Sequence, residues 1–332
     1  MASFVKFIAF VATYSFIQVA SAEIREETVR LDKEGVAAIA IHPQNPEVLY
    51  YGDRRGRLYR SSDRGVNWAP LNIGNVGFDI LDEVSAIIID PRIPQKVYFQ
   101  KHNTIYLSTD GGDTGRAIIS TGQEHGPLAL TLHPAAESVV YVGTDTGLVR
   151  TQDGGKLWHN VLRKKVYAVA ISTFAPDKIY AVGESVFVSN DGGTTWTETH
   201  IEHQDQILGF YAVVVAPHNP EVAYVGVLMK PDVKTPGVLK TVDGGKKWHP
   251  AGLDSTAVLE LTIDGNDDKV IYAGGGTKIH AGGVYWSQDS GTSWLNVYGW
   301  PTVMDLVLDP FSPHVLYVGT IGGMSRYTFE TK

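Results

Sequence analysis

The chain has 332 residues, of which 43% are hydrophobic and 19% are charged, a composition typical of a folded globular protein. Its 28 basic and 36 acidic residues give a net charge of −8, which argues against general attraction to nucleic acid or an anionic membrane. It contains no cysteine, which excludes disulfides, thiolate metal ligands and lipidated cysteines.

The first 22 residues have the pattern of a secretory signal peptide. Lys6 precedes the apolar run Phe7–Ala20, which ends in the small-x-small cleavage pattern Ala20-Ser21-Ala22. The run is short and contains polar residues, which favours cleavage over a membrane anchor. No later segment approaches the roughly 20 apolar residues of a membrane-spanning helix. We therefore predict a signal peptide over residues 1–22, a periplasmic or secreted location, no stable membrane insertion, and one domain over residues 23–332.

Two motifs then repeat along the chain. The first, here called the Pro corner, joins two apolar runs through a Pro-rich turn and ends in Tyr-x-Gly; its first copy is IAIHPQNPEVLYYG at residues 39–52. Further copies begin at Ile87, Leu130, Val169, Val213, Leu261 and Leu306. A period of about 40–45 residues with four strands in each unit is typical of a β-propeller.

The second motif, here called the Asp motif, is the octapeptide Ser/Thr-x-Asp-x-Gly-x-x-Trp, which occurs six times in phase with the Pro corners. Five copies keep the tryptophan, and the second has Gly115 in its place. An Asp carboxylate can accept backbone N–H groups within a turn, Gly permits a positive φ, and Trp can pack between units. We therefore assign a structural role to the aspartates, which are Asp63, Asp110, Asp153, Asp191, Asp243 and Asp289.

Each unit predicts four antiparallel strands, and the whole chain predicts an all-β, seven-bladed propeller. In the first unit we expect strands at residues 39–41, 48–51 and 57–60 and from Trp68 onward. The seventh unit ends after a third strand, Met324–Thr328, and has Phe329 where the Asp of the motif would stand. The alternating segment Glu27–Leu31 is predicted to supply the missing fourth strand and to close the ring without exposed sheet edges.

These motifs resemble the Asp-box, or BNR, repeats over essentially the whole chain after the signal peptide. Such repeats occur in sialidases, xyloglucanase-type glycosidases, sortilin-like receptors and the photosystem II assembly-factor family, so the resemblance implies a fold more than a function. The size, single ring and export signal are similar to the assembly factors, whereas the Pro corners are similar to the xyloglucanase and sortilin branch. A sialidase is disfavoured, because Arg92-Ile93-Pro94 falls within a Pro corner and no arginine triad matches.

Propeller geometry places the Pro corners and the Asp motifs on one face, here called the Asp-motif face. The opposite face, here called the loop face, is built from second-to-third strand turns and blade connections, where binding sites usually gather. The candidate binding residues on it are Arg54, Arg55, Arg163, Lys164, His102, Glu124, His203, Asp205 and Trp300. The assembly-factor resemblance implies that Arg54 and Arg55 form an arginine patch for a carboxylate-bearing partner.

We expect an exported, non-catalytic and monomeric propeller that binds a protein partner as a scaffold or assembly factor. The alternative is a glycoside hydrolase of the endo type, or a carbohydrate-binding protein, that uses two loop carboxylates and aromatic platforms such as Trp300. No residue is assigned a catalytic role. No metal site or cofactor is predicted, because the loop-face histidines lack ligand spacing and no nucleotide-binding motif occurs.

Overall fold

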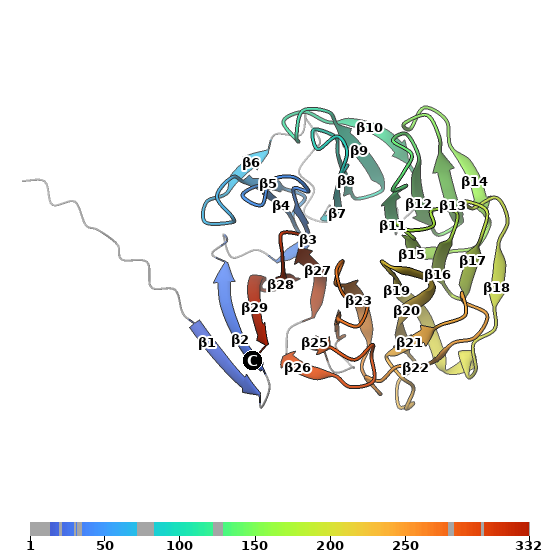
Figure 1. Cartoon of the computed structure of the whole chain (residues 1–332). Helices are drawn as coiled ribbons and strands as arrows, with labels where there is room; N and C mark the ends of the chain where they lie inside the picture. Colours follow the sequence, from blue (N-terminus) through green and yellow to red (C-terminus); the bar gives the residue numbers. More distant parts are fainter. Residues whose placement is uncertain are drawn as a thin grey trace, which may run out of the picture.

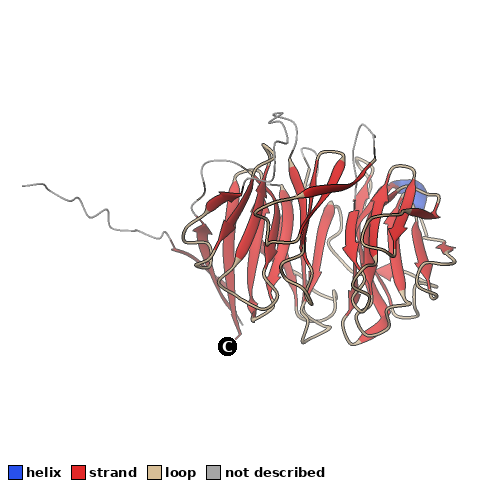
Figure 2. Cartoon of the chain, turned by 90° about the horizontal axis from the view of Figure 1, so that it is seen from above, coloured by secondary structure: helices blue, strands red, loops and turns tan. Residues whose placement is uncertain are grey.

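Seven antiparallel sheets form a ring in the computed structural model, which describes residues 14–19, 22–29, 31, 35–71, 83–121, 129–277, 282–299 and 302–331 (Figure 1). The strands run between two faces that carry the turns (Figure 2). The predicted seven-bladed propeller is therefore confirmed. One short 3-10 turn, η1 (Gln204–Gln206), is helical, and within the described ranges no helix is long and apolar enough to cross a membrane.

Each blade follows the predicted order of four strands from the axis outward. The inner strands are β3 (Val36–Ile41), β7 (Val84–Ile89), β11 (Ala129–Leu132), β15 (Val166–Ile171), β19 (Ile207–Ala216), β23 (Val258–Ile263) and β27 (Val303–Asp309). The second strands are β4 (Leu49–Asp53), β8 (Val97–Lys101), β12 (Val140–Thr144), β16 (Ile179–Gly183), β20 (Asn219–Met229), β24 (Ile271–Gly275) and β28 (Ser312–Thr320). The third strands are β5 (Leu58–Ser61), β9 (Thr104–Ser108), β13 (Gly147–Thr151), β17 (Val186–Ser189), β21 (Val238–Thr241), β25 (Gly283–Ser287) and β29 (Gly323–Thr331). The fourth strands are β6 (Ala69–Leu71), β10 (Arg116–Ser120), β14 (His159–Leu162), β18 (Thr197–Thr199), β22 (His249–Pro250), β26 (Leu295–Tyr298) and, in blade 7, β2 (Ala22–Val29).

The N-terminal strand closes the seventh blade, as predicted, but it begins earlier than expected. β2 pairs antiparallel with β29 and places Ile24 opposite Phe329. Ile24 is fully buried among aromatic side chains of blades 6 and 7, which explains why pairing starts upstream of Glu27. β1 (Tyr14–Val19) adds a fifth strand outside β2. It lies within the predicted signal peptide, so cleavage after Ala22 would remove β1 and leave β2 in the blade.

The hydrophobic core lies between the blades. Each buried cluster combines side chains of two adjacent sheets; one, for example, joins Ala38 and Tyr50 of blade 1 to Val84 and Phe99 of blade 2. Five of the seven Pro-corner tyrosines are among the largest fully buried side chains, namely Tyr98, Tyr141, Tyr180, Tyr224 and Tyr272. Stability is therefore distributed around the ring, because every blade covers the apolar faces of its neighbours.

The Asp motif forms the same hydrogen-bonded turn in every copy. In blade 4, Ser189 Oγ donates to Asp191 Oδ1 at 2.8 Å and accepts the Gly193 N–H at 2.8 Å. The Asp191 carboxylate also accepts the N–H and the hydroxyl of Thr195, which lowers its pKa to about 2. A backbone hydrogen bond also joins each Asp motif to the Pro corner of its own blade. In blade 4, the Gly192 N–H donates to the Asp177 carbonyl at 3.0 Å. The two motifs thus share one face.

Two adjacent residues of every Asp motif have positive φ, namely the fourth residue and the glycine after it. The fourth residue is Gly in four copies, but Ser290 (φ 63°) and Arg64 (φ 58°) hold this conformation with a side chain. We expect Ser290→Gly to raise the free energy of unfolding by up to about 1 kcal/mol, because the left-handed conformation costs a residue with a Cβ about 1–2 kcal/mol and greater chain entropy offsets part of the gain. Urea denaturation of the variant and the wild type measures the difference in the free energy of unfolding.

The reciprocal change at an equivalent position provides the control. Gly154 has the same conformation, and a Cβ there would meet no atom within 4 Å. Gly154→Ser should therefore destabilise the protein by a similar amount through backbone strain alone. Equal signs for the two substitutions would contradict this explanation.

Adjacent blades are joined by a recurring clasp on the Asp-motif face. The Tyr50 hydroxyl and the Arg60 guanidinium of blade 1 both donate to the Gly111 carbonyl in the Asp motif of blade 2, at 2.9 and 3.1 Å. Tyr141 and Arg150 of blade 3 bind the Gly192 carbonyl of blade 4 in the same way, at 3.0 and 2.7 Å. The tyrosine of the Pro corner and a cation on the third strand thus donate hydrogen bonds to the same carbonyl of the next blade.

The junction between blades 6 and 7 replaces this clasp with aromatic packing. Blade 7 has no Asp motif, and Trp286 stands where Arg60 and Arg150 stand in their blades. The Trp286 ring lies 4.8 Å from Phe329, and Tyr272 lies 5.0 Å from Phe329 in an edge-on arrangement. The three rings fill the space that an Asp motif and its cation occupy elsewhere.

Candidate functional site

The predicted binding residues within the described ranges lie on the loop face or in blade connections. Arg54 and Arg55 are exposed in the β4–β5 turn, and His102 is exposed in the β8–β9 turn. The exposed pair Arg163 and Lys164 lies between β14 and β15, and the exposed pair His203 and Asp205 lies between β18 and β19. Glu124 and Trp300 lie outside the described residues.

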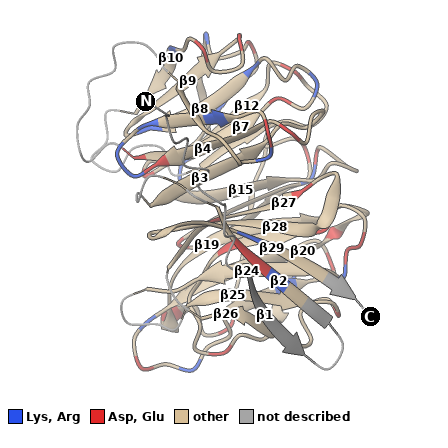
Figure 3. Cartoon of the chain, turned by 90° about the vertical axis from the view of Figure 1, so that its left-hand side faces the viewer, with Lys and Arg blue, Asp and Glu red and all other residues tan. Residues whose placement is uncertain are grey.

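The structure brings two of these residues together around Glu83. Arg54 Nε lies 3.8 Å from Glu83 Oε2, and the backbone N–H of His102 donates to the backbone carbonyl of Glu83 at 3.4 Å. The exposed residues Arg54, Arg55 and His102 thus stand in neighbouring turns where blades 1 and 2 meet, and they are here called the basic cluster. The pairs Arg163–Lys164 and His203–Asp205 lie farther around the ring, in the connections that leave blades 3 and 4. Lys, Arg, Asp and Glu residues stand mainly in turns and outer strands along the ribbon (Figure 3).

A second cluster, which the sequence analysis did not predict, lies where β15 and β19 begin. Lys165 Nζ lies 2.9 Å from Asp145 Oδ1, and this hydrogen bond raises the pKa of Lys165. The same ammonium lies 5.1 Å from the centre of the Tyr167 ring, which stacks on Tyr211 at 4.4 Å. Burial, reinforced by Tyr167, raises the pKa of Tyr211 to about 12. The sequence signal of this cluster is the repeated Tyr-Ala pair, Tyr167-Ala168 near the start of β15 and Tyr211-Ala212 in the middle of β19.

Two carboxylic acids stand on the inner strands of blades 6 and 7, and sequence reasoning missed them. Glu260 of β23 and Asp305 of β27 each follow a β-bulge near the start of the strand. Asp305 Oδ2 accepts the Ile39 N–H of blade 1 at 2.6 Å, so this side chain bridges the closure of the ring. The equivalent residue is alanine in the other five blades: Ala38, Ala86, Ala129, Ala168 and Ala212.

The electrostatic setting of this pair favours the protonated acids. Both side chains are half-buried between neighbouring blades, and burial raises the pKa of Asp305 to about 7. Burial and the nearby Asp305 charge together raise the pKa of Glu260 well above its ordinary value. A buried carboxyl costs free energy when it ionises, so alanine would be the more stable choice. Strongly shifted acids of this kind concentrate at functional sites.

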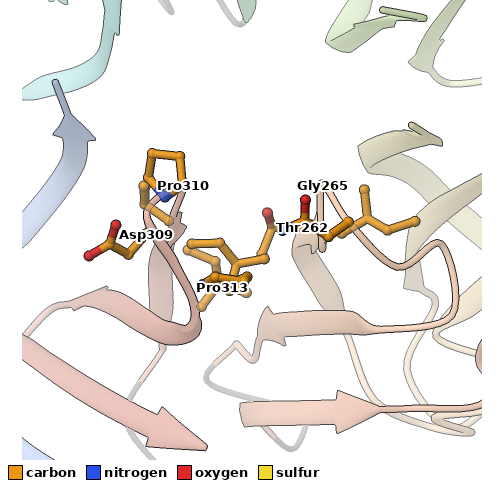
Figure 4. A pocket seen from close by; sticks show the side chains of 10 residues that line it. Thr262, Gly265, Asp309, Pro310 and Pro313 are labelled. Carbon is orange, nitrogen blue, oxygen red and sulfur yellow. The ribbon is translucent and has the colours of Figure 1, made fainter. Parts of the chain in front are cut away.

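A pocket of about 360 Å³ opens between the corners of blades 6 and 7 on the Asp-motif face (Figure 4). Thr262, Gly265 and neighbouring residues form one wall, and Pro310 and Pro313 lie across from them. Gly265 replaces the proline found at this corner position in five of the other blades, and a Cβ there would meet no atom within 4 Å. The corner of blade 6 therefore lacks the ring that those five blades carry at this position. The place of the pocket contrasts with the expectation that binding uses the loop face.

A second hollow, of about 510 Å³, lies between blades 4 and 5 around Lys178. The buried ammonium donates to Asn190 Oδ1 at 2.9 Å and to the Gly244 carbonyl at 3.0 Å, and it lies 3.4 Å from Glu221 Oε1. These contacts give Lys178 the same clasp role as the cations of other blades. No group of three or more His, Asp or Glu side chains in the described ranges is placed to hold a metal ion.

No protein-family model matches the sequence. Xyloglucanase Xgh74A of Acetivibrio thermocellus is 26% identical over 206 residues, which cover 48% of this chain and 24% of that enzyme. The GH74 xyloglucanase of Xanthomonas campestris superposes with a TM-score of 0.70 at 18% identity, over 91% of this chain and 53% of that one. YCF48 bound to a D1 peptide superposes with a TM-score of 0.63 at 16% identity, over 97% of this chain and 98% of that one.

The chain thus spans about half of the xyloglucanase structure and a smaller share of the xyloglucanase that matches by sequence. At these identities the structural likeness establishes the fold. The chain is a seven-bladed β-propeller of four-stranded blades, whose structural neighbours include both GH74 xyloglucanases and YCF48.

Proposed function

We propose that this chain is an exported, non-catalytic propeller that binds a protein partner through its loop face and acts as a scaffold or assembly factor. The observation that carries the proposal is the exposed basic cluster of Arg54, Arg55 and His102 at the junction of blades 1 and 2. Arginine suits this task because its planar guanidinium binds carboxylates through two parallel hydrogen bonds. The YCF48 structure with a bound D1 peptide supports peptide binding on this fold.

The charge arrangement of the loop face supports binding over hydrolysis. A glycosidase of the usual kind needs two carboxyl groups about 5–9.5 Å apart across a cleft. Two carboxylates in blade connections or turns of this face are instead paired with cations, Glu83 with Arg54 and Asp145 with Lys165. Among the described residues where blades 1 and 2 meet, three exposed basic side chains accompany Glu83, namely Arg54, Arg55 and His102.

A matched pair of charge reversals tests the proposal. We expect Arg54→Glu/Arg55→Glu to lower the recovery of partner proteins at least about tenfold in affinity purification from the native host, because like charges across an interface repel. Lys246→Glu/Lys247→Glu makes the same charge change at exposed positions of the Asp motif in blade 5 and should leave recovery unchanged. Quantitative mass spectrometry measures both. Recovery of the same proteins at the same level with both variants would contradict loop-face binding.

The second candidate function is carbohydrate binding or hydrolysis, which the xyloglucanase relatives favour. Glu260 and Asp305 add a chemical reason, since a carboxylic acid with a raised pKa is the usual proton donor in glycoside hydrolysis. Incubation with xyloglucan and an assay for reducing ends separates this function from the first. Release of sugar by the wild type that Asp305→Asn abolishes would establish the enzyme and refute the scaffold proposal.

A further inference from the structure

The outer edges of six blades carry features that limit the addition of another strand. β10, β14 and β26 each contain a bulge, with Ile118, Val161 and Val297 as the extra residues. β6 and β22 are three and two residues long and contain Pro70 and Pro250, and β18 has only three residues. Short length, proline and bulges are common means by which proteins prevent pairing at a sheet edge. These six edges are therefore poor templates for a further strand.

The outer edge of blade 7 has none of these features along the eight residues of β2. Its pairing with β29 is continuous, from Ala22 opposite Thr331 to Val29 opposite Met324, and its sequence contains no proline. β1 lies along the outer side of β2 and pairs with it antiparallel over six consecutive residues (Figure 1). β2 is thus a regular edge that accepts a further strand.

β1 belongs to the predicted signal peptide, so export would remove the strand that covers this edge. Cleavage after Ala22 leaves Glu23–Val29 as the outer strand of blade 7, with a row of backbone N–H and C=O groups directed outward. Water can solvate these groups, but such a row is also a template for pairing with another chain. This step rests on the export that is part of the proposed function above. The exported chain would have one long, regular edge available for pairing.

This strand is complementary to a second copy of itself. When two copies of Glu23–Val29 lie antiparallel with their Glu26 residues opposite each other, all seven residues overlap. Arg25 of each copy then lies opposite Glu27 of the other copy, on the same face of the sheet. The Glu27 carboxylate already accepts a hydrogen bond from Arg326 of its own blade. A row of alternating charges, Arg326, Glu27 and then Arg25 of the other copy, would therefore cross the junction twice.

Other registers are less favourable. A shift of two residues would place Arg25 opposite Arg25 or Glu27 opposite Glu27, and a shift of one residue would oppose side chains that point to different faces. In the favoured register the Glu26 carboxylates are the only like charges directly opposite each other. Each accepts hydrogen bonds within its own blade, from the Tyr327 hydroxyl at 2.9 Å and from Ser325 Oγ at 3.2 Å. Charge and register thus favour a second copy of this chain as the partner.

We propose that two exported chains form a two-fold symmetric dimer by antiparallel pairing of their β2 edges about Glu26. The junction would join two blades, each of four strands once β1 is removed, into one continuous sheet. Because the strands run between the two faces of the ring and would pair antiparallel, the loop faces of the two copies would point in opposite directions (Figure 2). The dimer would present two basic clusters to two partners. The precursor, in which β1 covers the edge, would stay monomeric.

Sedimentation equilibrium of the precursor and of the exported chain tests the proposal, after intact mass has shown whether the exported chain begins at Glu23. A single strand pair is a small interface, so we expect the exported chain to dimerise with a Kd on the order of 10 µM and the precursor to associate at least about tenfold more weakly. An exported chain that begins at Glu23 and stays monomeric at about 200 µM would overturn the dimer and leave loop-face binding unaffected. An exported chain that keeps β1 would overturn this inference together with the cleavage on which it rests.

Two charge variants of the exported chain test the register. Arg25→Glu places glutamate opposite Glu27, and Glu27→Arg places arginine opposite Arg25, so each variant alone should dimerise at least about tenfold more weakly. An equimolar mixture should recover the dimer, because opposite charges then face each other at both positions. Lys246→Glu makes a charge reversal at an exposed position of the Asp-motif face and should dimerise like the wild type. Melting temperatures check that the variants fold, since Glu27→Arg also loses the contact with Arg326. A mixture of folded variants that stays monomeric would overturn the proposal.

Discussion

Replacing Ile24 with aspartate is expected to lower the free energy of unfolding by more than about 4 kcal/mol. Ile24 is the fully buried residue of β2 that faces Phe329, and it packs with Tyr272 and Trp286 where the ring closes. An aspartate there would place an unpaired carboxylate among aromatic rings. It would also detach the strand that completes blade 7 and expose the edge of β29. Urea denaturation followed by tryptophan fluorescence measures the loss.

Ile24→Val provides the matched control, because it keeps the strand and removes one methylene. It should cost about 1 kcal/mol, the usual value for this change in a core. Similar stabilities for the two variants would show that β2 does not hold the ring closed. In the expected case, Ile24→Asp should also increase cleavage by trypsin at the ends of blade 7, since an open ring exposes its backbone.

The thermal stability of the wild type is expected to fall as pH rises from about 4 to about 7, because the carboxyl group of Asp305 loses its proton in the folded protein. Folding raises the pKa of Asp305 from its ordinary value to about 7, so in this window the folded state holds a proton that the unfolded state has released. At about 1.4 kcal/mol for each pH unit, ionised Asp305 destabilises the ring by an amount on the order of 4 kcal/mol. Glu260 extends the decline to higher pH.

Asp305→Asn should flatten this pH dependence, because the amide oxygen still accepts the Ile39 N–H and carries no charge. Glu260→Ala should raise the melting temperature at pH 8 by removing the second acid. Circular dichroism melts from pH 3 to pH 8.5 measure both, with Asp254→Asn as the surface control. An unchanged slope in Asp305→Asn would show that another group is responsible.

Stability should also fall at strongly acidic pH, because folding lowers the pKa of the aspartates in the Asp motifs. Hydrogen bonds from Thr195 and Ser189 hold the pKa of Asp191 at about 2, and those from Thr114 and Ser108 do the same for Asp110. The stability that such groups contribute is present above about pH 4 and is lost as pH falls toward 2. The two effects together place the maximum stability of the ring near pH 4.

The fold was predictable because the spacing of the two repeated motifs can be read directly from the sequence. The octapeptide and the Pro corner gave the number of blades and the order of strands, and the missing seventh octapeptide indicated closure by the N-terminal strand. The exact strand was less predictable, because the alternation at Glu27–Leu31 is local, whereas the position of β2 depends on Ile24 fitting a space built by blades 6 and 7.

The two inner-strand acids were less predictable, because repeats are recognised by the residues that their copies share. Glu260 and Asp305 stand inside apolar runs that otherwise resemble their five counterparts, and only the position-by-position difference from alanine distinguishes them. The pocket beside Gly265 could not be found in this way, because an opening depends on how the corners of two blades lie against each other. The contact between Arg54 and Glu83 likewise depends on the three-dimensional path of two loops.

The clasp between blades gives the ring a direction. Its donors, such as Tyr50 and Arg60, belong to the earlier blade, and the accepting carbonyl at Gly111 belongs to the later one. Blades 4 and 5 carry both halves of the clasp, since the Gly192 and Gly244 carbonyls accept while Lys178 and Lys240 donate. A duplicate of either blade would present both halves to its neighbours, whereas a duplicate of blade 6 would present Trp286 in place of the donating cation. Growth of the ring by duplication is therefore easier from some blades than from others.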